Sequence, residues 1–174
     1  EIQDMKNIIS LINESNFEVK NMAYLNPTFG EGGGTVGGAD GDLIIDDLLI
    51  DIKTTKNLVL DRKDLNQIFC YYIMSLIGGV NGDKNVKPIK RIGIYFARYG
   101  YLWTIPVSSI GSDRAINEFK DWWINYTNEK IWHNTDLKPY DVLSTKKHPV
   151  EFMSERQKAL MNGDKSNKYI PPNK

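Results

Sequence analysis

Two short apolar runs separated by two acidic residues form the clearest pattern in the chain. Leu43–Ile45 and residues 48–52 are rich in Leu and Ile and are bounded by Gly and Asp, which is typical of β-strands. If Asp46 and Asp47 form a two-residue turn, the runs pair as a hairpin whose side chains alternate between two faces. This pairing predicts an apolar face made of Leu43, Ile45, Leu48, Ile50 and Ile52.

The other face of the predicted hairpin collects charged side chains: Asp40, Asp42, Asp51 and Lys53. In this register Asp42 lies opposite Asp51, and Asp40 lies opposite Lys53. Like charges opposite each other destabilise a strand pair, and one of two close carboxylates normally takes a proton. A bound divalent cation removes both costs, so the hairpin is suited to hold a metal. Two alternatives remain open: a longer turn, which would separate the carboxylates, and a solvated hairpin whose acids only keep it soluble.

Helical and strand patterns continue on both sides of this hairpin. Apolar residues at three- and four-residue spacing predict three helices. One covers residues 5–12, the second has the stripe Leu65, Ile68, Phe69, Tyr72, Ile73, Leu76 and Ile77, and the third has the stripe Ile116, Phe119, Trp123 and Tyr126. Asp61 is a suitable N-cap for the second helix, and Gly78 with Gly79 ends it. Residues 91–97 and 101–105 predict another hairpin. The order of elements indicates an α/β sandwich around a mixed sheet.

A glycine-rich segment, residues 29–38, precedes the first hairpin. It lacks the Gly-Lys-Ser/Thr ending of a P-loop, which argues against nucleotide binding. We expect a flexible loop near the site, where the missing side chains let a backbone approach closely.

Composition narrows the class of protein. The chain has 174 residues, 41% of them hydrophobic, which suits one folded domain with a sizeable core. Its single cysteine, Cys70, excludes an internal disulfide and a Cys-based zinc or iron–sulfur site, and favours a cytoplasmic, intracellular protein. The longest apolar run, residues 68–74, is too short to span a membrane. Because the chain begins with Glu1, we expect it to be a piece of a longer protein.

Charge is unevenly distributed although the net charge is zero. Residues 138–174 carry eight Lys or Arg and four Asp or Glu, which gives this segment +4 and leaves −4 on residues 1–137. A neutral chain argues against a generic polyanion binder, but divalent ions at the acidic hairpin would favour phosphate there. Lys56, Arg62 and Lys63 follow the hairpin and could flank a phosphate path or be ordinary solvated charges. We expect a domain over residues 1–137 and a basic, loosely packed tail or linker over 138–174.

Two short motifs carry a resemblance to a known family. Asp42, eight residues, and then Asp51-Ile52-Lys53 resembles the signature of the PD-(D/E)XK nuclease superfamily, with Gly41 in place of the proline. Gln67 and Tyr71 match the Gln-x-x-x-Tyr motif of its RecB-like and lambda-exonuclease-like branch. The resemblance covers residues 36–107 and implies a restriction-endonuclease-like fold with an α-β-β-β-α-β core.

The resemblance also implies a function, which is Mg²⁺- or Mn²⁺-dependent hydrolysis of nucleic-acid phosphodiesters, DNA above all. Asp42 and Asp51 would be the main metal ligands, with the Ile52 carbonyl a third and Asp40 an accessory ligand or an ion-pair partner of Lys53. Lys53 would orient water or stabilise negative charge, Gln67 would hold water or a phosphate oxygen, and Tyr71 would contact the nucleic-acid backbone. A larger DNA-processing assembly is a further expected partner. The rival functions are a catalytically inactive nucleic-acid-binding domain and a metal-binding module without hydrolysis.

Overall fold

The predicted hairpin forms the middle of a five-stranded mixed sheet. Strands β2 (Leu43–Ile45) and β3 (Leu48–Lys53) pair antiparallel, with Ile45 opposite Leu48 and therefore a two-residue turn at residues 46–47. The predicted register is thus confirmed for residues 43–45 and 48–50, and the longer turn is excluded.

The structure is a computed structural model that describes residues 2–130. The remaining elements are α1 (Ile2–Ser10), η1 (Glu14–Phe17), β1 (Ala23–Leu25), α2 (Gly30–Gly34), α3 (Arg62–Gly78), β4 (Arg91–Phe96), η2 (Ala97–Tyr99), β5 (Tyr101–Pro106), η3 (Val107–Ser109) and α4 (Asp113–Lys130). The predicted basic segment 138–174 and the boundary before it lie outside the described residues. Within residues 2–130, no helix has the length and apolar character needed to cross a membrane.

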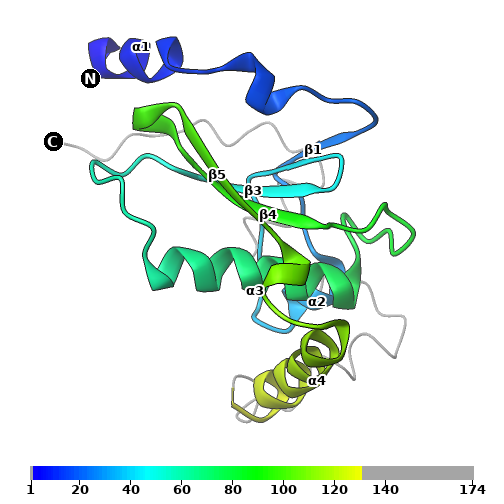
Figure 1. Ribbon diagram of the computed structural model, residues 1–174. Coiled ribbons are helices and arrows are strands. Elements are labelled where there is room, and N and C mark those ends of the chain that lie inside the picture. Colours follow the sequence, from blue (N-terminus) through cyan, green and yellow to red (C-terminus); the bar gives the residue numbers. More distant parts are fainter. Residues whose placement is uncertain (1, 131–174) are drawn as a thin grey trace, which may run out of the picture.

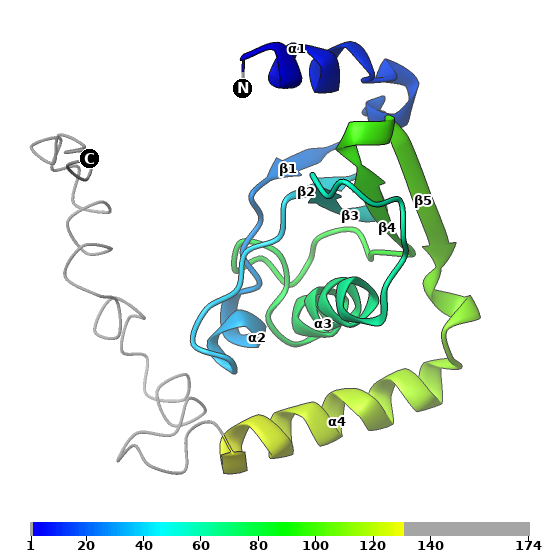
Figure 2. The same cartoon turned by 90° about the vertical axis from the view of Figure 1, so that its left-hand side faces the viewer.

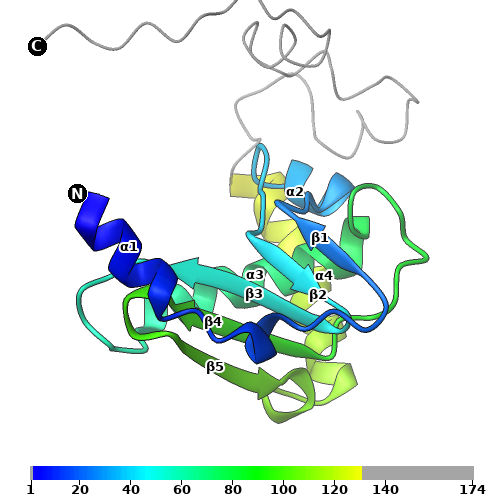
Figure 3. The same ribbon diagram turned by 90° about the horizontal axis from the view of Figure 1, so that it is seen from above.

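The strands lie side by side in the order in which they occur along the chain, β1-β2-β3-β4-β5 (Figure 3). Only β3 and β4 run parallel, and the other neighbours are antiparallel. A parallel pair needs a long crossover connection, and α3 supplies it. The fold is therefore α/β with a mixed sheet, as the sequence predicts.

Helices flank both faces of the sheet (Figure 1). α3 and α2 lie on one side with α4 beyond them, while α1 lies on the opposite side; Figure 2 gives the same layers from a second direction. The predicted third helix is α4, in which Ile116 is buried but Tyr126 is 44% exposed, so Tyr126 is not a core residue. The predicted first helix is α1, which has no buried residue.

The alternation of side chains along the hairpin divides the core in two. Leu43, Ile45, Leu48 and Ile50 form the cluster on the α1 side, together with Tyr95 and Ala97. Ile44 and Leu49 belong to the larger cluster, which includes Ile68 and Ile73 of α3. The predicted apolar face is confirmed except at Ile52, which is 39% exposed because the hairpin ladder ends before it.

Close backbone approach explains the glycine-rich segment. The prediction of a flexible loop was wrong, since residues 30–34 form the short helix α2 against α3. A Cβ at Gly32 would lie 2.0 Å from the Met74 carbonyl oxygen, and one at Gly78 would lie 2.0 Å from the Phe29 oxygen. Packing of this closeness overrides the low helix propensity of glycine. The close approach is therefore made by α3 rather than by a ligand.

Both predicted ends of α3 are confirmed. The Asp61 side chain accepts a hydrogen bond from the Asp64 amide, and Gly79 ends the helix with a φ of 73° that glycine adopts without strain. Its predicted apolar stripe was wrong at Leu76, which is 41% exposed, while Met74 is buried instead. The backbone of Met74 packs closely against Gly32 of α2. The sequence pattern of α3 alone does not indicate this contact.

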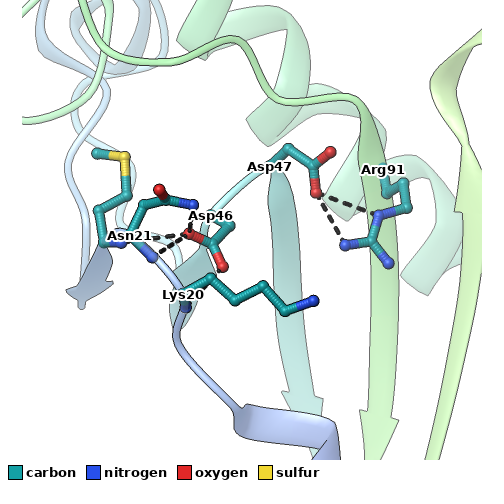
Figure 4. Close-up of polar contacts among 6 residues, drawn as sticks. Lys20, Asn21, Asp46, Asp47 and Arg91 are labelled. Carbon is teal, nitrogen blue, oxygen red and sulfur yellow. Dashed lines mark hydrogen bonds and ion pairs between the residues drawn. The ribbon is translucent and has the colours of Figure 1, made fainter.

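The two acidic residues of the hairpin turn are structural (Figure 4). Asp46 has a φ of 54°, and its carboxylate accepts hydrogen bonds from the amides of Lys20, Asn21 and Met22. Asp47 Oδ1 accepts two hydrogen bonds from the Arg91 guanidinium, at 2.8 and 3.2 Å. These contacts, rather than solubility or metal binding, explain the acids of the turn.

Acid should weaken this turn. The hydrogen bonds from Lys20, Asn21 and Met22 lower the pKa of Asp46 from 3.8 to about 2. A lowered folded-state pKa contributes stability that is present above 3.8 and lost as the pH falls through about 2. Asp46→Asn should therefore lower the melting temperature by a few degrees at pH 7, and the difference should shrink by pH 2. Asp121→Asn on the exposed face of α4 is the control, and a difference that stays constant with pH would contradict this account.

Candidate active site

Three residues from β3 and α3 meet at the carboxyl end of β3. Lys53 Nζ lies 2.8 Å from Gln67 Oε1 and 2.9 Å from Asp51 Oδ2. The side chain of Asp51 is 4% exposed and that of Lys53 is 22% exposed. The predicted catalytic residues Asp51, Lys53 and Gln67 are thus brought into direct contact, on the sheet face that α3 covers.

The Gln67 side chain connects Lys53 to the next turn of α3. While Gln67 Oε1 accepts from Lys53, Gln67 Nε2 donates to Tyr71 Oη at 2.8 Å. The Tyr71 ring stacks on Phe29, with ring centroids 5.4 Å apart. The predicted proximity of Gln67 and Tyr71 on one flank of the helix is confirmed, and the contacts run without a gap from Asp51 to Tyr71.

Asp42, the residue directly before β2, reaches the same end of β3. Its Oδ2 accepts a hydrogen bond of 2.6 Å from the Ile52 amide, in a place where a backbone carbonyl would continue the ladder. The N–H and C=O of one strand residue point the same way, so the Ile52 carbonyl also faces Asp42. Two of the predicted metal ligands are therefore neighbours.

Asp40 does not pair with Lys53, so that part of the prediction was wrong. The backbone pairing of the hairpin starts at Leu43, so Asp40 lies outside it. Asp40 instead forms an isolated bridge with Thr28. Lys53 instead lies opposite Phe96 of β4. Asp40 as an accessory metal ligand stays a prediction.

Asp64, rather than the predicted Asp40, is the second acid that lies near Lys53. Its Oδ1 lies 3.5 Å from Lys53 Nζ, and its side chain is 16% exposed. Sequence reasoning missed it, because an acid in the first turn of a helix is already explained by the helix dipole. The available signal was spacing, since Asp64, Gln67 and Tyr71 are three and four residues apart and share one face of α3.

Burial and neighbouring charges set the protonation of the site. Burial raises the pKa of Asp51, the contact with Lys53 opposes this, and the nearby carboxylates of Asp42 and Asp64 raise it further. Burial alone would lower the pKa of Lys53, but the hydrogen bond and charge of Asp51, with the charge of Asp64, outweigh it and raise the pKa. Lys53 is therefore a cation at neutral pH and cannot act as a proton acceptor.

The oxygen atoms at this end of the sheet are of the kind that Mg²⁺ binds. Asp51 Oδ2 is buried, and it lies 2.9 Å from its ion-pair partner, Lys53 Nζ. Residues 2–130 contain no group of three or more His, Cys, Asp or Glu able to hold a metal ion. Mg²⁺ does not need one, because it keeps several waters and binds through one or two carboxylates plus substrate phosphate. Asp42, Asp51 and the Ile52 carbonyl are the groups that could supply such ligands.

The predicted cations lie along the connection between Lys53 and Gln67. Lys56 is in the loop that joins β3 to α3, and Arg62 and Lys63 are in the first turn of α3. All three are exposed. They therefore lie on the segment that connects Lys53 to the helix of Gln67, and their contact with phosphate stays a prediction.

Gly41 stands where the resembled signature has a proline, and the structure explains why proline would not suit this position. Its amide donates a hydrogen bond of 2.8 Å to the Pro27 oxygen. Proline has no amide hydrogen, so it would lose this bond beside the isolated bridge at Asp40. A Cβ at Gly41 would also lie 3.1 Å from the Phe29 ring.

Comparisons with known proteins add no family assignment. No protein-family model matches the chain, and neither a curated protein nor a solved structure gives a significant match.

Gln67→Ala should separate positioning from metal binding. The substitution removes the acceptor of Lys53 and the donor to Tyr71 but no candidate metal ligand. If the site cleaves nucleic acid, as the resemblance implies, the rate should fall by on the order of ten- to a hundredfold, the usual effect of losing a supporting hydrogen bond, while calorimetry should give a near wild-type metal affinity. Asn66→Ala, on the exposed face of the same helix, is the matched control. Equal loss of metal binding would contradict this role.

Proposed function

We propose that the protein is a metal-dependent nuclease that hydrolyses phosphodiester bonds of nucleic acid, with DNA as the expected substrate. The observation that carries the proposal is the continuous set of contacts Asp51–Lys53–Gln67–Tyr71, with Asp42 beside it. A buried carboxylate and a lysine in contact suit a site where negative charge must be bound and stabilised.

The element order is consistent with the restriction-endonuclease-like fold that belongs to this proposal. The chain runs α1, β1, β2, β3, α3 and β4, with the short α2 inserted after β1. This is the α-β-β-β-α-β order that the resemblance implies. In this arrangement the signature acids come from adjacent strands and the Gln-x-x-x-Tyr motif from the helix that follows.

Lys53 is the proposed electrostatic catalyst. In hydrolysis a water oxygen bonds to phosphorus, the water loses a proton, and one ester P–O bond breaks as its oxygen gains a proton. Negative charge grows on the phosphate and the leaving oxygen during this step. The Lys53 ammonium, held by Asp51, Asp64 and Gln67, is fixed in advance to stabilise that charge.

Gln67 and Tyr71 position other groups. Gln67 holds Lys53 through its oxygen and Tyr71 through its nitrogen, so both amide atoms are engaged. Tyr71 Oη accepts from Gln67, which leaves its own O–H to donate to a phosphate oxygen. When bound by Asp42, Asp51 and the Ile52 carbonyl, a divalent cation supplies a Lewis acid that polarises the phosphate and lowers the pKa of water.

A substrate panel tests the proposal. Labelled single-stranded DNA, duplex DNA and RNA of one sequence are incubated with the protein in Mg²⁺, Mn²⁺ or chelator, and binding is followed separately by anisotropy. The proposal expects cleavage of DNA that chelator abolishes. Binding without cleavage would favour the inactive nucleic-acid-binding alternative. Metal binding without either would favour the metal-binding module.

A further inference from the structure

A small apolar pocket lies beside the candidate active site and has no part in the contacts described so far. Its volume is about 110 Å³, and it is lined by Leu58, Leu60, Phe96, Tyr101 and Trp103. Pockets that enclose a whole small ligand are usually about 300–1,000 Å³. A pocket of this size suits one ring of a larger molecule that is held elsewhere.

The pocket is next to Lys53. Phe96 is the partner of Lys53 in the parallel pairing of β3 and β4, and neighbouring strands lie about 4.8 Å apart. Leu58 and Leu60 belong to the loop that leads from Lys53 to α3, the helix that carries Gln67. A molecule with one part at Lys53 can therefore place an adjacent part in the pocket.

Hydrogen bonds hold the wall formed by this loop. Arg98 Nε donates to the Thr54 oxygen at 2.9 Å, and the Tyr99 hydroxyl donates to the Lys56 oxygen. Arg98 is itself fixed by an ion pair with Asp4 of α1. The two ends of the loop segment before Leu58 are thus tied to η2, so the pocket is formed in advance of binding.

The lining suits a flat aromatic ring. Phe96 and Tyr101 are nearly parallel, with an interplanar angle of 23° and centroids 6.5 Å apart. Phe96 is buried as a floor, whereas Tyr101 and Leu58 are each 49% exposed. Bases stack on such aromatic side chains without regard to sequence, since every base has a π-face.

We infer that this pocket binds one unpaired base of the strand whose phosphate lies at Lys53, which makes single-stranded nucleic acid, or an unpaired end, the substrate class. The inference rests on the proposed function for the position of the phosphate. A base within a duplex is stacked and paired and cannot enter a pocket without leaving the helix, which costs a few kcal/mol. The exposed cations Lys56, Arg62 and Lys63 lie on the same loop and helix start, where they can follow the backbone of that strand.

Tyr101→Ala tests the pocket through binding rather than cleavage. Anisotropy is measured in Ca²⁺, which also takes oxygen ligands, on a single-stranded oligonucleotide, on its duplex and on versions with abasic positions. The variant should bind the single strand about five- to a hundredfold more weakly, corresponding to one stacked base, with little change on duplex. Tyr101→Phe should bind as the wild type does. An abasic position at the pocket should weaken the wild type and leave Tyr101→Ala unaffected.

Matched controls separate the possible outcomes. Tyr126→Ala, an equally exposed tyrosine on α4 that does not line the pocket, should leave binding unchanged, and Leu58→Ala provides a second pocket variant if Tyr101→Ala fails to fold by circular dichroism. The inference would be overturned if both pocket variants bound the single strand as tightly as the wild type does, or if the wild type did not prefer single strands. Neither result would contradict cleavage. If the wild type cleaves no substrate but the pocket variants lose single-strand binding, the pocket is supported and the nuclease proposal is rejected.

Discussion

Asp51→Asn should abolish metal-dependent cleavage while the protein stays folded. Asn has the shape of Asp but not its charge, so metal affinity should fall by at least about tenfold, which is the lower end of the effect of changing a group that only supports a metal ligand. Asp51 is buried beside Asp42, Lys53 and Asp64, and its Oδ2 forms an ion pair with Lys53 Nζ at 2.9 Å.

The same substitution should change how stability depends on pH. Because the pKa of Asp51 is raised, the folded protein binds its proton more tightly than the unfolded chain does. The stability that this proton contributes is fully present below the unfolded value of 3.8 and is lost as the pH rises through the raised pKa. Asp51→Asn should lack that decline and, without metal, melt at or above the wild-type temperature at neutral pH.

Calorimetry with Mn²⁺, thermal melts and cleavage assays on one preparation check both expectations. Asp121→Asn makes the same chemical change on α4 and serves as the control. In the wild type, metal at a hundredfold excess over its dissociation constant should add about 2.7 kcal/mol of stability, and this gain should be absent from Asp51→Asn. An identical metal-induced gain in the two proteins would refute Asp51 as a ligand.

Lys53→Ala should slow cleavage by on the order of a hundredfold or more, which is the range for losing one preorganised electrostatic group. Its metal affinity should be retained or increased. The reason is that Lys53 Nζ lies 2.9 Å from Asp51 Oδ2 and competes with a metal ion for that negative charge. Metal binding and cleavage would therefore separate in this variant and fall together in Asp51→Asn.

Removing Lys53 also leaves a buried carboxylate without its cation, which is destabilising. Melting curves with and without metal distinguish this effect from a loss of catalysis, since bound metal should restore the stability but not the rate. Lys90→Ala, which removes an exposed lysine before β4, should leave rate, metal affinity and stability unchanged. A Lys53→Ala protein that binds metal more weakly than the wild type would contradict the competition described here.

Local patterns made the hairpin and α3 predictable. The period of two in the apolar runs and the two-residue turn fix the pairing of Ile45 with Leu48, because a slip of one residue would reverse the buried face. Likewise, the four-residue separation of Gln67 and Tyr71 is enough to place them together on a helix. These features depend on neighbours in sequence, so they can be predicted without knowledge of the rest of the fold.

Features that depend on distant contacts could not be predicted. β1 is three residues long and exists because it pairs with β2, and α2 is helical although four of its five residues are glycine, because α3 packs against it. In the site, Asp64 rather than Asp40 lies near Lys53, because the hairpin pairing does not extend from Leu43 back to Asp40. The pairing stops there because the Asp42 side chain, instead of a backbone carbonyl, accepts the hydrogen bond of the Ile52 amide.

The most direct test of the central claim is the cleavage rate of labelled single-stranded DNA in Mg²⁺ under single-turnover conditions, for wild type and Lys53→Ala purified in the same way. Parallel purification excludes a contaminating nuclease, which would act equally in both samples. We predict cleavage by the wild type that chelator stops, and a rate in the variant that is lower by about a hundredfold or more. Equal rates in the two proteins, or no cleavage of DNA or RNA by a folded wild type that binds metal, would contradict the assignment of a nuclease site to Asp42, Asp51, Lys53 and Gln67.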